Sequence, residues 1–257
     1  MTNPETQAVP PAFSAAGLHE QVVEKIRPHL PAGSRILDLG AGAGALSFRL
    51  AREGYQLQAA DYMVESFLPE NIPAVQVDFD KPEQTCNALE GFDPEMIVTC
   101  EVIEHLKHPL AYLQMCNALL QTGKLLTVTL PNVTSPSSRI NTLINGWPNS
   151  FGPLRRQVGH ITPLFPTQVA DMLEMAGFEV IQTGSVGPKF TIFPRSVSLR
   201  GLIQSALTCL LRPLMRNVHS GACMFFLARK IADCGQIQSV RPAGTGRGEA
   251  YRVRRSA

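Results

Sequence analysis

The sequence has few charged residues, few aromatic residues and no long apolar segment. Asp, Glu, Lys and Arg make up 17% of its 257 residues, and Phe, Trp and Tyr make up 7%. The longest segment without a charged residue, from His108 to Gly123, carries several polar side chains, so no transmembrane span is expected. The hydrophobic content of 44% excludes a wholly disordered chain, and we expect one large folded domain.

Signals for secretion are also missing from the sequence. The first basic residue is Lys25, so the N-terminus lacks the basic and apolar regions of a secretory signal. The six cysteines form no Cys-x-x-Cys pair and no spacing typical of a disulfide framework. We therefore expect reduced thiols, no zinc site built on cysteine and a cytoplasmic protein. A peripheral contact with the inner membrane face is a further hypothesis.

Charge is distributed unevenly along the chain. From Arg229 to the end the sequence has seven Lys and Arg but only two Asp and Glu. The rest of the chain holds the other 16 basic and 19 acidic residues. Residues 231–257 are therefore predicted to form a basic, disordered tail. Residues 1–16, rich in Pro, Ala, Thr and Gln without periodicity, are predicted to form a disordered arm. The folded domain is expected to cover 17–230.

Short apolar runs alternate with helical patterns through most of this domain. Strands are predicted at 35–39, 55–60, 74–77, 96–100, 124–130, 178–182 and 222–228. Helices are predicted at 18–30, 45–52, 109–120 and 167–176. This order predicts an α/β fold, a doubly wound, mostly parallel seven-stranded sheet with helices on both faces. Such sheets bind ligands beyond the carboxyl ends of their strands.

A glycine-rich loop follows the first predicted strand. Gly40, Gly42 and Gly44 allow a tight turn and close backbone approach, and the next helix directs free N–H groups to the same place. Asp61, after the second strand, is placed to accept both hydroxyls of a ribose. A dinucleotide and S-adenosylmethionine both fit this pattern. Asp38 favours S-adenosylmethionine, because a carboxylate there attracts the amino group of its methionine part and repels a pyrophosphate.

Several motifs occur in the order seen in class I S-adenosylmethionine-dependent methyltransferases, and the sequence resembles that family. The likeness covers about residues 18 to 185 and the last strand, and it implies a Rossmann-like fold. Part of it is similar to the branch that includes ubiquinone-biosynthesis O-methyltransferases. The matching segments are 36–44 (ILDLGAGAG), 61–63, 78–80, 99–105 and 123–132, with 159–161 and 176–178 for that branch.

The resemblance implies an S-adenosylmethionine site at the carboxyl edge of the sheet. In this family, the residues at Asp61 and Tyr62 hold the ribose, and the loop at Asp78 and Phe79 lies beside the adenine. The full set of implied cofactor-binding residues is Asp38, Gly40, Gly42, Gly44, Asp61, Tyr62, Asp78, Phe79 and Glu101. One departure is Pro166, where the family has Ser or Thr before a helix; proline suits a first helical turn, so we expect a changed cap.

Two glutamates and a histidine follow the fourth predicted strand. On a helix, Glu101, Glu104, His105 and His108 would share one face. The favoured hypothesis places Glu101 at the cofactor and His105 and His160 at the acceptor, as catalytic proton acceptors. A second assigns Mg²⁺, Mn²⁺ or Zn²⁺ to Glu101, Glu104, His105 and either His108 or His160, since related Glu-x-x-Glu-His arrangements bind metals in ubiquinone-type enzymes and small-RNA 2′-O-methyltransferases. A third gives the group only a structural role.

Two segments are candidates for the acceptor side. The connection 132–165 is predicted to be an acceptor-binding insertion, with Trp147, Phe151 and the pair Arg155-Arg156 as candidate contacts; an insertion packed for structure is the alternative. Segment 195–216 carries a helical apolar stripe with basic ends, and an amphipathic helix is predicted there. We expect it to cover the sheet or to form an oligomer interface, and contact with an anionic membrane is the alternative.

These observations together predict a methyltransferase that acts on a small molecule, at an oxygen of a phenol, quinol, sugar or lipid-linked hydroxyl. A metal-dependent RNA 2′-O-methyltransferase is one alternative. Nucleic acid is an unexpected partner, however, because the body is acidic and carries no stripe of aromatic and basic residues. A catalytically silent cofactor-binding module is another alternative. An NAD-dependent oxidoreductase is disfavoured by Asp38. Neither the acceptor nor the oligomeric state follows from the sequence.

Overall fold

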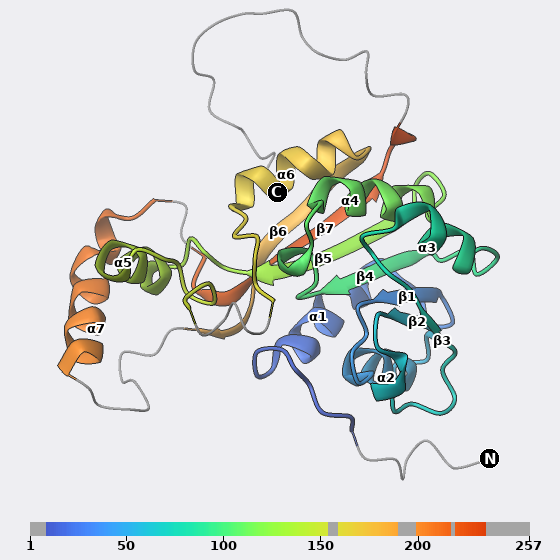
Figure 1. Cartoon of the computed structure of the whole chain (residues 1–257), viewed down its shortest axis with the longest axis horizontal. Helices are drawn as coiled ribbons and strands as arrows, with labels where there is room; N and C mark the ends of the chain where they lie inside the picture. The colour runs from blue at the N-terminus through green and yellow to red at the C-terminus, as the bar shows by residue number, and fades with distance from the viewer. Residues whose placement is uncertain (1–8, 154–158, 190–198, 217–218, 235–257) are drawn as a thin grey trace, which may run out of the picture.

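The molecule is built around one seven-stranded sheet with helices on both faces (Figure 1). The computed structural model describes residues 9–153, 159–189, 199–216 and 219–234. The strand order across the sheet is β3-β2-β1-β4-β5-β7-β6. In chain order the strands are β1 (Arg35–Leu39), β2 (Gln56–Asp61), β3 (Ala74–Gln76), β4 (Met96–Cys100), β5 (Leu125–Pro131), β6 (Phe178–Lys189) and β7 (Gly221–Lys230).

Strand direction brings the ends of several distant strands to one edge. Strands β1 to β5 pair in parallel, whereas β7 runs antiparallel to both β5 and β6. The loops after β1, β2, β4 and β5 therefore meet at the carboxyl edge. Because β7 is reversed, its first residues lie at this edge too, and Cys223 pairs with Pro131 of β5. The predicted mostly parallel seven-stranded sheet is confirmed.

Helices pack in layers on the two faces (Figure 1). One face carries α1 (Leu18–Ile26) and α2 (Ala45–Arg52), and the other carries α3 (Pro82–Ala88), α4 (Pro109–Ala118) and α6 (Pro166–Met175). Two more helices, α5 (Pro136–Asn145) and α7 (Leu199–Leu211), lie side by side beyond the carboxyl end of β5. We call the α5–α7 pair the arm.

Alternation along β1 shows how the sheet divides the core. Ile36 packs in the cluster formed with α1 and α2, whereas Leu37 and Leu39 pack in the cluster formed with α4 and α6. All three side chains are fully buried. Burial of each such side chain stabilises the fold by about 1.5–3 kcal/mol, so this short strand contributes to the core on both faces of the sheet.

Several predicted boundaries need correction. The strand predicted at 178–182 is too short, because β6 pairs with β7 as far as Lys189, with register shifts after Val180 and Val186. The connection 132–165 contains helix α5, and α3 is also a helix that the apolar pattern did not predict. In α5 the Ser135 hydroxyl accepts a hydrogen bond from the Ser138 amide, so polar capping, not periodicity, marks its start.

The predicted change of cap at Pro166 is confirmed. Pro166 is the first residue of α6, where its missing N–H costs no hydrogen bond. The side chain of Gln168 accepts a hydrogen bond from the amide of Phe165 at 2.9 Å. Gln168 therefore satisfies the amide of Phe165, the residue before the helix, whereas the hydrogen bond that a Ser or Thr side chain at that residue could accept from inside the helix is not made.

Candidate functional site

The glycine loop crosses the carboxyl edge between β1 and α2. Gly40, Gly42 and Gly44 have φ angles of 82°, 53° and 86°, which residues with a Cβ rarely adopt. The Gly42 amide donates to Asp61 Oδ2 at 2.8 Å, and Asp61 Oδ1 accepts from the Met63 amide at 2.9 Å. Asp61 thus ties the end of β2 to the loop. Each carboxylate oxygen has a further lone pair, so Asp61 can still accept from ribose hydroxyls.

Close packing joins this loop to the segment after β4. A Cβ on Gly40 would collide with the side chain of Val102, and a Cβ on Gly44 would come within 2.5 Å of Pro69. Phe13, from the N-terminal segment, also lies against the loop, since a Cβ on Gly42 would be 3.7 Å from its ring. The cofactor loop and the residues after β4 therefore form one continuous site.

Asp38 lies beneath the loop rather than on its surface. Its side chain is only 1% exposed, and the Ser47 hydroxyl donates to Asp38 Oδ2 at 2.5 Å. Burial raises the pKa of Asp38 to about 6, although the Ser47 hydrogen bond opposes this shift. Ser47 links the loop to the first turn of α2 and escaped the sequence reasoning, because a serine inside a helix carries no distinctive pattern.

The segment after β4 is a short turn, and the predicted shared helical face is wrong. A 3₁₀ turn covers only Ile103 to His105, and Glu101 has a positive φ of 60°. Pro109 starts α4, and His108 before it has φ −128° and ψ 69°, as expected for a residue that precedes a proline, so neither Glu101 nor His108 has helical geometry. The side chains that meet at this turn are therefore not those spaced by helical periodicity.

Glu101 is a half-buried acid without a complete set of partners. Its Oε1 atom is buried and has no hydrogen-bond partner among the described residues. Burial raises the pKa of Glu101 to about 7, although a hydrogen bond with Cys223 opposes this shift. A buried carboxylate is favourable only when paired. The ammonium group of a methionine moiety would supply that pair, beside the loop residue Gly40.

Glu104, His105 and His160 meet at the same edge. One potential ligand atom from each lies within 4.8 Å of the other two. The two imidazole rings meet edge to face at 4.7 Å, and Phe151 packs against His160 at 5.6 Å between ring centroids. Glu104 is fully buried, and neither carboxylate oxygen has a hydrogen-bond partner among the described residues. Burial, reinforced by the charge of Glu101, raises the pKa of Glu104 well above its usual value.

This group fits a divalent cation. A buried carboxylate without partners and two imidazoles form a donor set that suits Zn²⁺ or Mn²⁺ better than Ca²⁺. Glu101 and His108, which sequence spacing added to the metal set, are not members of the group that the described residues form. The third member of the group is His160, which the metal hypothesis named as the alternative to His108.

The remaining cofactor candidates follow β2 and β3 at the same edge. Tyr62 is 64% exposed beside Asp61, where its ring is free to cover a nucleoside. Lys81 lies 3.0 Å from Asp78 and holds the pKa of that carboxyl below its usual value. Phe79 is half-buried and packs edge to face on Tyr112, with centroids 5.3 Å apart. These residues line the route from the ribose position toward β3.

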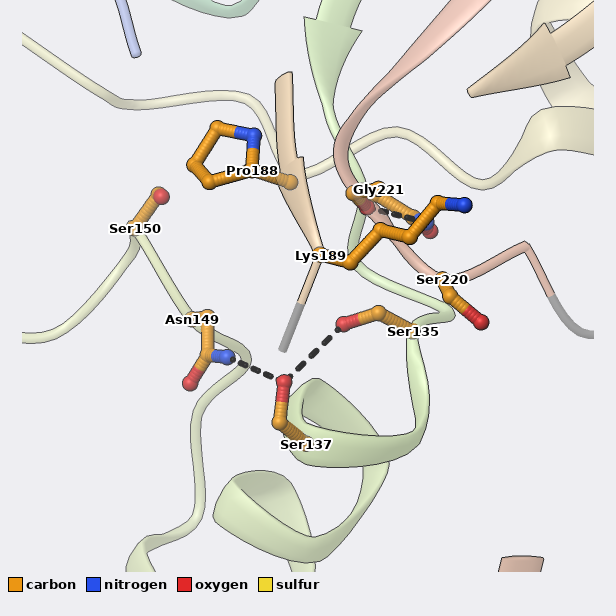
Figure 2. Close-up of a pocket in the computed structure, with 10 residues that line it drawn as sticks. Ser135, Ser137, Asn149, Ser150, Pro188, Lys189, Ser220 and Gly221 are labelled. Carbon is orange, nitrogen blue, oxygen red and sulfur yellow. Dashed lines mark hydrogen bonds between the residues drawn. The ribbon is translucent and has the colours of Figure 1, made fainter. Parts of the chain in front are cut away.

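A polar cavity of about 410 Å³ lies at the end of β5 (Figure 2). In it, Ser137 lies between Asn149, which donates to its hydroxyl at 3.1 Å, and Ser135, at 3.4 Å. Lys189 supplies one cation at the end of β6. Ser150 has a φ of 69°, a strained conformation of the kind that gathers at binding sites. The lining residues are Asn132, Ser135, Ser137, Asn149, Ser150, Pro188, Lys189, Ser220, Gly221 and Ala222.

Two residues that line this cavity are next in sequence to residues that contact His160 and Glu101. Ser150 precedes Phe151, which packs on His160, and Ala222 precedes Cys223, which contacts Glu101. Most of these wall residues were not predicted from the sequence, although the pair Ser135-Pro136 is a known helix start. Of the acceptor candidates that it named, Trp147 is 39% exposed on the arm, and Arg155 and Arg156 lie outside the described residues.

The described residues test only part of the predictions on membrane contact and on the two ends of the chain. No helix in the described part of the chain combines the length and the apolar character needed to cross a bilayer. Helix α7 covers most of the segment predicted as amphipathic, whereas 195–198 lie outside the described residues. Residues 1–8 and 235–257 are outside them as well, so the disordered arm and tail stay predictions.

Comparison with protein families matches residues 15–183 to a family model described as a methyltransferase domain. Curated proteins called ubiquinone biosynthesis O-methyltransferase are among the similar sequences. One from Cereibacter sphaeroides is 28% identical over 194 residues, which covers 70% of this chain and 74% of that protein. One from Ruegeria pomeroyi is 29% identical over 188 residues, covering 71% and 75%.

Solved structures share the fold at low sequence identity. A SAM-dependent methyltransferase from Archaeoglobus fulgidus superposes with a TM-score of 0.57 at 20% identity, covering 82% of this chain and 94% of that one. Magnesium protoporphyrin IX methyltransferase from Synechocystis, solved with bound SAH, gives 0.54 at 14% identity, covering 82% and 81%. These two similarities support the Rossmann-like architecture.

Proposed function

Because this chain belongs to the methyltransferase domain family and is an S-adenosylmethionine-dependent methyltransferase, we propose that it methylates an oxygen atom of a small hydroxyl-bearing molecule. The observation that supports this most directly is the position of His105 and His160. They meet at the turn after β4, and Val102, at the start of that turn, packs on Gly40 of the cofactor loop. Proton-accepting groups thus lie close to where a methyl group is presented.

The roles of the chain's own residues follow from these positions. We assign the ribose of the cofactor to Asp61 and its ammonium group to Glu101, whose buried oxygen otherwise lacks a partner. When bound, S-adenosylmethionine supplies a methyl group already activated by the sulfonium. The protein then has to align the acceptor oxygen with that carbon and exclude water.

Proton removal is the step that an acceptor hydroxyl adds. A ring nitrogen of His105 or His160 takes the hydroxyl proton while the oxygen forms its bond to the methyl carbon and the carbon–sulfur bond breaks. The electron pair of that bond remains on sulfur, so the products are a methyl ether, the demethylated cofactor and an imidazolium. The buried Glu104 carboxylate, when ionised, stabilises that imidazolium.

A divalent cation held by Glu104, His105 and His160 is a second arrangement, favoured by the two unpartnered oxygens of Glu104. Such an ion would lower the pKa of an acceptor hydroxyl and orient it. We infer that the acceptor belongs to the same class whether imidazole alone or a bound cation assists the reaction. Removal of metal ions before assay separates the two, since imidazole alone needs no metal.

The cavity beside β5 indicates the kind of acceptor. Its walls offer hydroxyl and amide groups and the Lys189 ammonium, and few apolar side chains. We propose that it binds the polar part of the acceptor, such as a sugar or a phenol that carries an anionic group. The similarity to ubiquinone biosynthesis O-methyltransferases supports a phenolic hydroxyl as the reacting group.

The test is a methyl-transfer assay with labelled S-adenosylmethionine and a panel of phenols, quinols, sugars, lipid-linked hydroxyls and a short RNA. We expect a methyl ether with one small-molecule class and none with RNA. Cofactor binding without transfer to any hydroxyl would contradict O-methylation and favour a silent module, and transfer to RNA alone would favour the 2′-O-methyltransferase alternative. A cytoplasmic location stays a prediction that this assay does not address.

A further inference from the structure

The arm formed by α5 and α7 turns its apolar side chains outward. Leu210 and Leu214 are 72% and 78% exposed, and Ile203 is 51% exposed. On α7 the buried positions are polar, namely Ser205 and Thr208, while Leu207 and Leu211 are half-buried. An ordinary surface helix buries its apolar face and exposes its polar face, so the exposure of Leu202, Ile203 and Leu210 on α7 departs from the usual arrangement. The arm therefore presents a surface that favours an apolar partner.

Helix α5 extends the same surface. Leu143 is 75% exposed and lies on α5, which packs beside α7, and Ile144 and Trp147 add further exposed apolar area. A hydrogen bond from Gln204 to Asn141 joins the two helices, and Ile140 of α5 is buried, whereas Leu143 and Ile144 of the same helix are exposed. Seven exposed large apolar side chains lie on the arm or within three residues of the end of one of its helices: Leu143, Ile144, Trp147, Leu202, Ile203, Leu210 and Leu214.

Charge around the arm has one sign. The sequence contains no Asp or Glu from 105 to 170, nor from 180 to 232, and both helices of the arm fall within these ranges. Arg212 and Arg216, both exposed, follow α7 beside Leu214. Arg139 is on α5, and its guanidinium donates to the Arg216 carbonyl. An apolar surface bordered by arginines, without acids, complements a layer that is apolar inside and anionic at its surface.

We propose that the arm docks on an anionic lipid membrane, with Leu210 and Leu214 inserted below the headgroups and Arg212 and Arg216 at the phosphates. A second copy of this chain suits the surface poorly, because a two-fold contact would set the arginines of both arms together without an acid to pair them. The chain's own segment 235–257 is also a poor partner, since it carries five Arg and one Glu. This inference does not depend on the nature of the acceptor.

Vesicle cosedimentation of the full chain tests the proposal. We expect binding to vesicles of phosphatidylcholine with phosphatidylglycerol, and little binding to phosphatidylcholine alone. The double variant Leu210→Asp/Leu214→Asp should bind at least roughly 10-fold more weakly, because two apolar insertions are lost. Arg212→Gln/Arg216→Gln should lose roughly 30-fold, and the loss should shrink as salt is added.

A matched control separates the arm from general surface effects. Met175 is 55% exposed on α6, away from the arm, so Met175→Asp should bind vesicles as the unchanged chain does. Binding of S-adenosylhomocysteine reports that each variant is folded. The basic tail is present in every variant, so binding through the tail would survive Leu210→Asp/Leu214→Asp and would overturn the proposal.

Two other results would also overturn it. One is the absence of binding to anionic vesicles by the unchanged chain. The other is a dimer, seen by light scattering, that Leu210→Asp/Leu214→Asp converts to a monomer without any vesicle binding, since the occupant would then be a second copy.

Discussion

The imidazole rings of His105 and His160 meet edge to face, with centroids 4.7 Å apart and planes at 85°. His105 ends the turn after β4, whereas His160 belongs to the segment that returns from the arm toward α6. Gly159 makes the close approach feasible, because it has a φ of 83° and a Cβ there would lie 3.1 Å from His105 Nδ1. The candidate acceptor site therefore depends on two segments that lie far apart in the sequence, one before β5 and one after it.

Replacement of either histidine should impair methyl transfer without impairing cofactor binding. For His105→Asn and His160→Asn we expect kcat to fall by about 10²–10⁴, the usual contribution of a positioned proton acceptor. The affinity for S-adenosylhomocysteine, measured by calorimetry, should not change. His108→Asn is the matched control, since His108 is exposed and lies outside the group. An equal loss in His108→Asn would contradict the assignment.

Glu104→Gln tests whether the group holds a metal ion. Without metal, the amide removes a buried acid that has no partner, so the variant should fold at least as stably as the unchanged chain near pH 7. If an ion binds, Mn²⁺ or Zn²⁺ at about 100 times its Kd should stabilise the unchanged chain by about 2.7 kcal/mol and leave Glu104→Gln unaffected. Thermal unfolding with and without a chelator measures this difference, and equal shifts in both proteins would exclude Glu104 as a ligand.

Asp61 should be necessary for tight cofactor binding. Asp61→Asn keeps an oxygen that can accept from the Gly42 amide but loses the charge that strengthens hydrogen bonds to ribose hydroxyls. We expect the affinity for S-adenosylhomocysteine to fall by roughly 10–100-fold, which corresponds to hydrogen bonds with a charged group. Asp171→Asn, at an exposed position on α6, is the control. Unchanged affinity in Asp61→Asn would place the ribose elsewhere.

The polar cavity should affect acceptor affinity more than the rate of the bound complex. With a dihydroxybenzoate as the probe acceptor, Ser137→Ala/Lys189→Gln should raise KM by roughly 10-fold with kcat nearly unchanged, because uniform binding is lost. Lys124→Gln is the lysine control, since Lys124 precedes β5 at the opposite edge of the sheet and pairs with Glu95. A fall in kcat at constant KM would place this cavity outside the acceptor site.

The sequence predicted the sheet well because burial leaves a direct pattern. The short apolar runs at 35–39 and 96–100 match β1 and β4 without change, since strands covered on both faces are mostly apolar. The glycine loop and Asp61 were likewise predictable, because a tight turn requires particular residue types. Ser135 and Pro136 at the start of α5 give a weaker signal, since polar capping leaves no periodicity to detect.

The site after β4 was harder to predict, and the reason is geometric. Residue types identified Glu104 and His105, but the choice between His108 and His160 as their neighbour depends on a 3₁₀ turn and on a segment that returns from the arm. Neither is encoded in local spacing. The exposure of apolar side chains on α7 was also beyond sequence reasoning, because a periodic stripe does not say which face meets the protein.

Asp38 links the cofactor site to stability through pH. Its pKa is raised by burial from 3.8 to about 6, so the folded state holds this proton more tightly than the unfolded state. The contribution of protonated Asp38 is therefore complete below about pH 4 and is lost as pH rises through about 6. Above that, an ionised and buried Asp38 costs the ligand-free protein roughly 2–3 kcal/mol.

Asp38→Asn should remove this cost while keeping an oxygen that accepts the Ser47 hydrogen bond. We expect the variant to be more stable than the unchanged chain at pH 8 by up to roughly 2–3 kcal/mol, and about equally stable at pH 4. Urea unfolding at the two pH values measures the difference. The same variant should bind S-adenosylmethionine more weakly, because one of the acids near the cationic cofactor is gone. Stability gained together with affinity lost would show that this acid is retained for binding at a cost to the fold, whereas a variant destabilised at both pH values would show that Asp38 acts mainly through packing.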